Sequence, residues 1–174
     1  NGGAVYVSSA VGPNLLECTF VDNLAETSGG ALYLSQASGL RLDRCSILGN
    51  RAAAFGGGLH NNGGIAELIS TVVSGNSAAS GGAIYNIFVG SLTLTNCTFS
   101  SNVASSSVGG VLNSSGSISN VISSIFWGNQ DNSGSTQLSQ FYGPGSSINY
   151  SCVQGWTGSL GGTGVYGRSY AGNG

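Results

Sequence analysis

Apolar and polar positions recur along this chain with a period of about 26 residues. An asparagine that stands three residues after an apolar residue marks each period, and successive asparagines are 27, 26, 26 and 27 residues apart. The five marks are Asn23, Asn50, Asn76, Asn102 and Asn129. Glycine pairs such as Gly29-Gly30 recur roughly midway between them. Two independent marks that share one period over five repeats identify a repeat protein.

Aligning the repeats on these asparagines produces columns of similar residues. The residue three positions upstream is apolar in every repeat: Phe20, Ile47, Val73, Phe99 and Phe126. The residue five positions upstream is small: Cys18, Cys45, Thr71, Cys97 and Ser124. The residue eight positions upstream is aliphatic: Leu15, Leu42, Leu68, Leu94 and Val121. A further aliphatic column follows the glycine pairs: Val5, Leu32, Leu59, Ile84 and Leu112. Columns of this kind predict a continuous buried interior.

The spacing within one repeat predicts short strands. The positions five and three residues before each asparagine alternate as a strand requires, whereas the step from eight to five breaks the alternation and predicts a bend. A third strand is expected after each glycine pair. β-branched residues, Gly and Ser are weak helix formers, which disfavours a helical repeat. We therefore expect an all-β chain that forms a parallel β-helix of about six coils, each of 26–27 residues.

The asparagines are predicted to form a structural ladder. Stacked coils would place them about 4.8 Å apart, so that their amides can hydrogen-bond along the stack. Asparagine also tolerates the left-handed backbone of a sharp bend, and the glycine pairs are expected to serve another corner. Alanines two residues after the ladder positions are expected to fit a tight corner: Ala25, Ala52, Ala78 and Ala104.

The pattern loosens after Asn129. We expect one domain with the β-helix over residues 1–156, followed by a Gly-, Ser- and Tyr-rich segment over residues 157–174. That segment either adds an irregular coil or lies across the end of the helix. Residues 137–142 and 148–153 are predicted as strands, and Cys152 is expected to continue the column of small residues.

The composition excludes several classes of protein. Four basic and six acidic residues give a net charge of −2, and without lysine the chain cannot build the basic patch that nucleic acid requires. No apolar run approaches the roughly 20 residues of a membrane span. The cysteines lack the close pairs of a zinc site, and we expect no metal and no cofactor. With no initiator methionine or leader-like segment, the sequence is expected to be a mature form or an excised piece.

The cysteines are expected to be buried small residues, because Thr71 and Ser124 replace them in register. Cys18 and Cys45 would lie on adjacent coils, near enough for a disulfide, which is the alternative.

An aromatic column is the candidate binding face. It reads Tyr6, Tyr33, His60, Tyr85 and then Asn113, next to an aliphatic column and therefore on the opposite face. Outward aromatic rings could stack on sugars or pack against a neighbour. The favoured alternative is that the rings only shield the coil. His60 is expected to be one more ring in that stack, with no catalytic or ligand role.

Catalysis is the remote alternative, in the form of a polysaccharide lyase or hydrolase. Such enzymes need clustered carboxylates. The acids are Glu17, Asp22, Glu26, Asp43, Glu67 and Asp131. Glu17 is expected to pair with Arg44 at the surface, and Arg41, Arg44, Arg51 and Asp43 to form a solvated charge cluster. No two acids share a column on neighbouring coils, so we expect no enzyme.

The tetrapeptides of residues 2–5, 29–32 and 81–84, all Gly-Gly-Ala followed by an aliphatic residue, alternate with F-x-x-N units. This arrangement resembles the repeats of polymorphic outer-membrane proteins, which are right-handed β-helical passengers on bacterial surfaces, several of them adhesins. Residues 96–104 and 148–155 are also similar to the rungs of large bacterial secreted β-helix proteins. The resemblance, together with the right-handed preference of parallel crossovers, implies a right-handed β-helix that is extracellular or at the cell surface.

Two functions from different classes remain open. Both ends of a β-helix carry unpaired backbone groups, which solenoids normally cap. The chain opens directly inside a repeat, has no lysine to guard an edge, and carries little net charge. We therefore expect a structural protein whose copies stack head to tail into a filament or surface layer. The alternative is an adhesin or carbohydrate-binding segment of a bacterial surface protein, with glycans as partners of the aromatic face.

Overall fold

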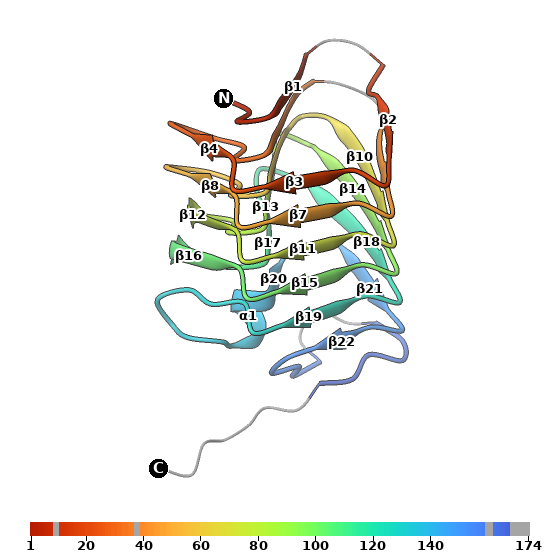
Figure 1. Ribbon diagram of the computed structural model, residues 1–174. Helices are drawn as coiled ribbons and strands as arrows, with labels where there is room; N and C mark the ends of the chain where they lie inside the picture. The colour runs from red at the N-terminus through yellow and green to blue at the C-terminus, as the bar shows by residue number, and fades with distance from the viewer. Residues whose placement is uncertain (9–10, 37–38, 159–161, 168–174) are drawn as a thin grey trace.

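The computed structural model describes residues 1–8, 11–36, 39–158 and 162–167, which form a parallel β-solenoid (Figure 1). The chain winds through stacked coils, and each strand pairs in parallel with the equivalent strand of the next coil. The predicted fold class, an all-β stack of parallel coils, is confirmed.

Four sheets form the walls of the solenoid, three of them with six strands and one with four. The first sheet contains β1 (Val5–Ser8), β5 (Leu32–Ser35), β9 (Leu59–Asn62), β13 (Ile84–Ile87), β17 (Val111–Asn113) and β20 (Phe141–Tyr142). The second contains β2 (Asn14–Leu16), β6 (Leu40–Asp43), β10 (Ile65–Ile69), β14 (Ser91–Thr95), β18 (Ile118–Ile122) and β21 (Ser147–Asn149). The third contains β3 (Thr19–Val21), β7 (Ser46–Leu48), β11 (Val72–Ser74), β15 (Thr98–Ser100), β19 (Ile125–Trp127) and β22 (Cys152–Val153). The fourth contains β4 (Leu24–Ala25), β8 (Arg51–Ala52), β12 (Ser77–Ser80) and β16 (Val103–Ser107).

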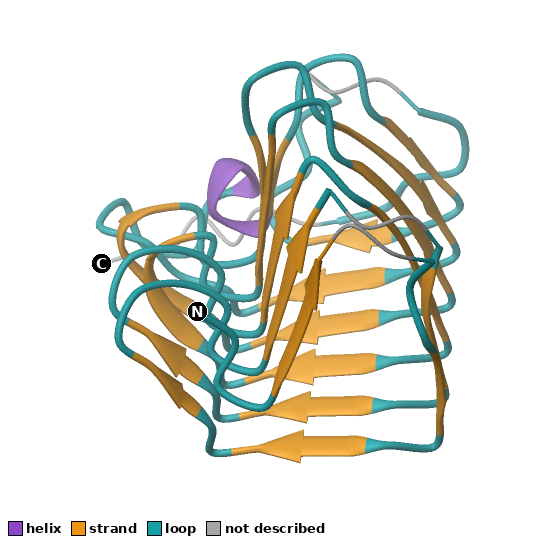
Figure 2. Ribbon diagram, turned by 90° about the horizontal axis from the view of Figure 1, so that it is seen from above, coloured by secondary structure: helices purple, strands orange, loops and turns teal. Residues whose placement is uncertain are grey.

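The fourth sheet corrects the prediction of three strands in each coil. Seen from above, its strands form a lobe beside the first sheet (Figure 2). The alanines that we expected at a tight corner are the buried residues of this lobe, and Ala25, Ala52 and Ala78 pack on one another. An alanine is suitable there because only a methyl group has to be covered. A two-residue strand is too short to show alternation in the sequence.

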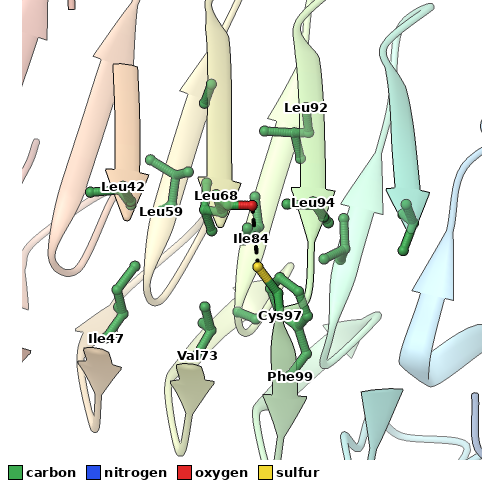
Figure 3. Packing of buried hydrophobic residues seen from close by; sticks show 14 of the residues in the cluster. Leu42, Ile47, Leu59, Leu68, Val73, Ile84, Leu92, Leu94, Cys97 and Phe99 are labelled. Atoms are coloured by element: carbon green, nitrogen blue, oxygen red, sulfur yellow. Dashed lines mark hydrogen bonds between the residues drawn. The ribbon is translucent and has the colours of Figure 1, made fainter. Parts of the chain in front are cut away.

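The interior is filled by the predicted apolar columns (Figure 3). Leu42, Leu68 and Leu94 point inward from the second sheet, and Ile47, Val73 and Phe99 from the third. The rings of Phe99 and Phe126 stack with centroids 4.7 Å apart. A fully buried side chain of this size stabilises the fold by roughly 1.5–3 kcal/mol.

The aliphatic column predicted after the glycine pairs contains one wrongly assigned residue, Leu112. Val111, and not Leu112, pairs with Ile84, so that Leu112 lies one residue further along. The glycine pair Gly109-Gly110 does not align with Gly81-Gly82, because the N–H of Gly81 donates to Ser107 and that of Gly82 donates to Val108. Val108 therefore stands in the register of Gly81 and adopts the same left-handed backbone, with φ +55° against +62°. An alignment on glycine pairs could not detect this substitution.

The five asparagines of the predicted ladder are joined from coil to coil. Each of the first four donates from Nδ2 to the Oδ1 of the next, at 2.8 to 2.9 Å. The same Oδ1 also accepts the backbone N–H of the preceding asparagine. The ladder ends where Asn129 donates to Oε1 of Gln140 at 2.8 Å. The left-handed residue at this corner is not the asparagine, as we expected, but the residue before it: Asp22, Gly49, Gly75, Ser101 and Gly128.

A second asparagine ladder lies inside the first sheet and was not foreseen. Asn61 donates to Asn86 at 2.8 Å, and Asn86 donates to Asn113 at 2.7 Å. All three are buried, in the register where β5 carries Leu34. Asn113 was wrongly assigned to the aromatic column, through the same one-residue shift as Leu112. Its ladder can sit in an apolar interior because each amide also bonds to neighbouring backbone or hydroxyl groups.

The small-residue column lies at the bend before the third sheet. Cys45 and Cys97 are buried, and each thiol donates to a carbonyl of the preceding coil. Burial raises the pKa of the Cys97 thiol to about 11. All four cysteines, Cys18 included, are free. The column continues at Ser151 and not at Cys152, because Oγ of Ser151 accepts the backbone N–H of Ser124 at 3.0 Å.

The last coil departs from the predicted strands. Residues 137–142 form the short helix α1 (Gln137–Gln140), with Thr136 as its N-cap, and then β20. Residues 148–153 belong to two strands, since Tyr150 adopts φ +51° between β21 and β22. Beyond β22, Trp156 and Val165 pack against the core, and the N–H of Val153 donates to Tyr166.

Candidate binding groove

The aromatic column follows the outer face of the first sheet. The pairing of the strands aligns Tyr6, Tyr33, His60, Tyr85, Leu112 and Tyr142. The column thus contains the four predicted residues and continues through Leu112 to Tyr142. The structure brings these residues together on one face, while the ladders and the small column lie at the corners and in the interior.

Neighbouring rings of this column are in contact. The ring centroids of Tyr6 and Tyr33 are 5.3 Å apart, those of Tyr33 and His60 are 4.8 Å apart, and those of His60 and Tyr85 are 5.3 Å apart. The hydroxyl of Tyr33 also accepts a hydrogen bond of 2.9 Å from Nδ2 of Asn62. These are ordinary spacings for stacked or tilted aromatic pairs.

Phe55 covers the middle of the column, and sequence reasoning missed it. Its ring stacks on Tyr85 at 4.7 Å and meets His60 edge-on at 5.9 Å. Phe55 pairs with Ser28 in the preceding coil and with Ser80 in the following one. The signal was one large ring in a column of serines, but that column becomes visible only once the fourth sheet is recognised.

The rings differ sharply in exposure along the column. Tyr6 is 53% exposed, whereas Tyr33, His60 and Tyr85 are 8%, 6% and 9% exposed. Three of the four residues of the predicted contact face are therefore covered by their neighbours. In this arrangement they act mainly by shielding the first sheet.

His60 is buried among these rings without a polar partner. Neither ring nitrogen forms a hydrogen bond within the described part of the chain. Burial lowers the pKa of His60 to about 4, because the charged imidazolium would lose its hydration. The imidazole is thus neutral and aromatic in function, which leaves it poorly suited to acid–base chemistry near neutral pH.

A cleft lies at the C-terminal end of the aromatic column. The cleft has a volume of about 1090 Å³ and lies between β16, the loop that leads into α1, and the outer face of β17 and β20. Leu112 and Tyr142 form its apolar wall. Ser107, which pairs with Ser80, occupies the register of Phe55 at this level, so no ring fills the space. The outer face of the aromatic column is therefore covered by Phe55 in the middle coils and accessible beside the last coils.

The charged side chains form ion pairs elsewhere on the surface. Arg44 pairs with Glu17 at 3.0 Å, as predicted, and with Asp43 at 3.3 Å. Arg41 pairs with Asp43 and with Glu67. Arg51 was wrongly included in this cluster, because it lies on β8 in the fourth sheet. The carboxylates of this network face arginines, and exposed pairs of this kind contribute little to stability.

Metal ligands and membrane-spanning helices can be assessed for residues 1–8, 11–36, 39–158 and 162–167. No three His, Cys, Asp or Glu side chains within these ranges are grouped so that they could hold a metal ion. The one short helix in these ranges is far from the length needed to cross a membrane.

Comparison with known proteins links two segments of the chain to one family. Residues 17–35 and 70–87 match the model of the Chlamydia polymorphic membrane protein repeat. The predicted resemblance to polymorphic outer-membrane protein repeats is confirmed, and the repeat and the β-solenoid together fit a bacterial surface protein of the adhesin type. No curated protein and no solved structure matches the chain.

Proposed function

We propose that this chain is a non-catalytic structural segment of a bacterial surface protein, whose N-terminal edge stacks on another β-helical coil. The observation that carries the proposal is the state of the core at that edge. Leu15 and Phe20 are only partly buried, whereas their equivalents one coil further, Leu42 and Ile47, are fully buried. A further coil on this edge would cover the exposed apolar surface.

The asparagine ladder supports the same proposal, because the hydrogen bonds between its asparagines all run in one direction along the stack. Each Oδ1 from Asn50 onward accepts hydrogen bonds from the preceding coil. Within the described residues, the Oδ1 of Asn23 accepts none. An incoming coil with an asparagine in register would supply both the amide and the backbone N–H that this oxygen lacks.

Head-to-tail stacking into a filament or layer is one form of the proposal. It would require Trp156 and Val165 to leave the core at the C-terminal end, where both pack. Two copies that meet through their N-terminal edges need no such change. Edge strands pair readily unless charge or proline guards them, and the strands of the first coil, β1 to β4, contain neither, although Pro13 directly precedes β2.

The experiment is sedimentation and electron microscopy of the folded chain over a range of concentrations, with two matched variants. Leu15→Lys places a charge at the open core, whereas Leu16→Lys places it on the exposed outer face of the same strand. We expect the chain to associate, Leu15→Lys to remain monomeric and Leu16→Lys to behave as the unmodified chain. Filaments with an axial repeat near 30 Å, about six coils of roughly 4.8 Å, would identify head-to-tail stacking. Particles of two copies would identify edge-to-edge pairing.

A chain that stays monomeric at high concentration would overturn the proposal. So would equal loss of association in both variants, because it would place the contact on the outer face.

The adhesive function through the aromatic column is the second candidate, and the exposure of Tyr6 is the observation that favours it. Changing the exposed Tyr6 to Ser should abolish glycan or cell binding if that face is the site.

A further inference from the structure

We propose that the cleft beside β17, β20 and α1 binds a short, uncharged oligosaccharide. This site differs from the aromatic face predicted from the sequence, since it is built from Leu112, Tyr142 and residues that leave the repeat. Its volume of about 1090 Å³ slightly exceeds the roughly 300–1,000 Å³ typical of ligand pockets, which favours several linked rings over a single small molecule.

The apolar wall can stack on a sugar ring. Tyr142 is 42% exposed, in contrast to Tyr33 and Tyr85, whose rings are covered by their neighbours. Leu112 and Val108 also line the cleft, and both are mostly buried and pack with Tyr85, so this part of the wall is held by the core of the column. A pyranose presents an apolar C–H face of the kind that packs on an aromatic ring.

The facing wall supplies hydrogen-bonding groups at high density. Four serines line the cleft together with Asp131: Ser106, Ser107, Ser133 and Ser135. Asp131 is held in place, because its Oδ1 accepts the N–H of Ser133 at 2.8 Å and its Oδ2 accepts the N–H of Val108 at 3.3 Å. Each carboxylate oxygen can accept a second hydrogen bond, and neighbouring sugar hydroxyls are suitable donors.

Charge selects among glycans. Among the described residues that line the cleft none is basic, and Asp131 carries a negative charge. A uronate or sulfated sugar would meet a carboxylate with no compensating cation, which disfavours binding. The cleft is therefore complementary to neutral sugars and not to the acidic polysaccharides that many β-helices cleave.

The register of Phe55 provides a direct way to close the site. Phe55 and Ser107 occupy equivalent positions two coils apart, because both pair with Ser80. Phe55 covers the aromatic column at its level by stacking on Tyr85. Ser107→Phe would place a ring over Leu112 and Tyr142 in the same manner. Tyr142→Ala removes the stacking surface, and Tyr6→Ala is the matched control, an exposed tyrosine of the same column at the other end.

The experiment is isothermal titration calorimetry of the folded chain and these variants with three hexasaccharides: a β-linked glucan, a β-linked N-acetylglucosamine oligomer and a polyuronate. We expect at least one neutral hexasaccharide to bind and the polyuronate not to bind. Tyr142→Ala and Ser107→Phe should each weaken binding about tenfold, as the loss of an aromatic contact does, and Tyr6→Ala less than twofold. Asp131→Asn serves as a further variant if Ser107→Phe does not fold.

Three results would overturn the proposal. The first is that neither neutral hexasaccharide binds at millimolar concentration. The second is that the polyuronate binds as tightly as they do. The third is that Tyr142→Ala binds as the unmodified chain does, or that Tyr6→Ala weakens binding equally.

Discussion

The first and last coils described for this solenoid are built from the same repeat and yet differ in how their core is covered. The inward residues of the first coil, Val5, Leu15 and Phe20, are only partly buried. Their counterparts in the last coil, Phe141, Ile148 and Val153, are completely buried. The difference arises because Trp156 and Val165 pack against the core beyond β22. A coil cannot close its own end, and closure requires a segment that leaves the repeat.

The two ends also differ in their hydrogen bonds. At the C-terminal end, Gln140 from α1 takes the place of a sixth asparagine: its Oε1 accepts from Asn129, and its Nε2 returns a hydrogen bond to the Asn129 carbonyl. At the N-terminal end, the ladder stops at Asn23 without a replacement. The last coil therefore satisfies the polar and apolar demands of an end together, and the first coil satisfies neither.

The largest expected effect separates an inner ladder position from the open end. Asn76→Ala would leave the backbone N–H of Asn50 without its acceptor. It would also remove one hydrogen bond each from the amide of Asn50, the Oδ1 of Asn102 and the carbonyl of Ile47. We expect it to lower the free energy of unfolding by about 4 kcal/mol. Asn23→Ala should lower it by about 1 kcal/mol, because the Oδ1 of Asn23 accepts no hydrogen bond within the described residues and only its Nδ2 donates to the next coil. Urea denaturation would measure both. Equal losses would show that the open end is not weaker than the interior.

The second effect uses pH to compare the exposed and buried parts of the aromatic column. The pKa of His60 falls from 6.5 to about 4 on folding, so the unfolded chain takes up the proton at a higher pH than the folded one. Its contribution is fully present above pH 6.5 and is lost as the pH falls towards 4, in total about 3 kcal/mol. His60→Phe should remove this loss. Thermal melts of both chains between pH 7 and 4 would test it, and parallel curves would contradict it.

The third effect breaks the closed end. Trp156 packs on the core, and Trp156→Ala should lower the free energy of unfolding by about 2 kcal/mol, roughly half the loss expected for a fully buried tryptophan. Amide hydrogen exchange should accelerate in β20 and β22 and stay unchanged in β7. The exposed Tyr166 is the matched control, and its change to Ala should have little effect. Association that increases in Trp156→Ala would show that this segment limits end-to-end stacking.

The smallest effect changes a middle coil without touching either end. Val89 is exposed and adopts φ +61°, a conformation that is strained for a β-branched residue. Val89→Asn removes that strain, because asparagine tolerates the left-handed region. We expect a gain of about 1 kcal/mol in the free energy of unfolding, measured by urea denaturation. A loss of stability would mean that the side chain makes a contact that compensates for its strain.

The repeat itself could be predicted because stacking places equivalent residues over one another. Each column that faces the interior must keep one character, and Phe20, Ile47 and Val73 therefore stand out in a sequence alignment of the coils. The register failed at Leu112, because Val108 adopts a conformation that we expected only of glycine. The inner ladder of Asn61, Asn86 and Asn113 was also missed. A polar residue cannot be recognised as buried from the sequence until its hydrogen-bond partners on the neighbouring coils are known.

The cleft could not be predicted from the repeat, because it arises where the repeat stops. Its wall depends on the absence of a ring at Ser107, and its other side depends on α1 and the loop before it. The residues of α1 and of the loop before it interrupt the repeat and have no equivalent in the preceding coils. Periodicity reveals the scaffold, whereas the candidate site lies in the residues that depart from it.

The uniform ladder has a consequence for how such a chain can change in length. Every inner asparagine makes the same bonds to the coil before and the coil after, so a coil could be duplicated or deleted without disturbing the bonding of the rest. Each duplication would lengthen the rod by about 4.8 Å and carry the cleft that much further from the open edge. The number of coils would thus set the length of the solenoid, whereas the sequence of the last coil would set the properties of the cleft.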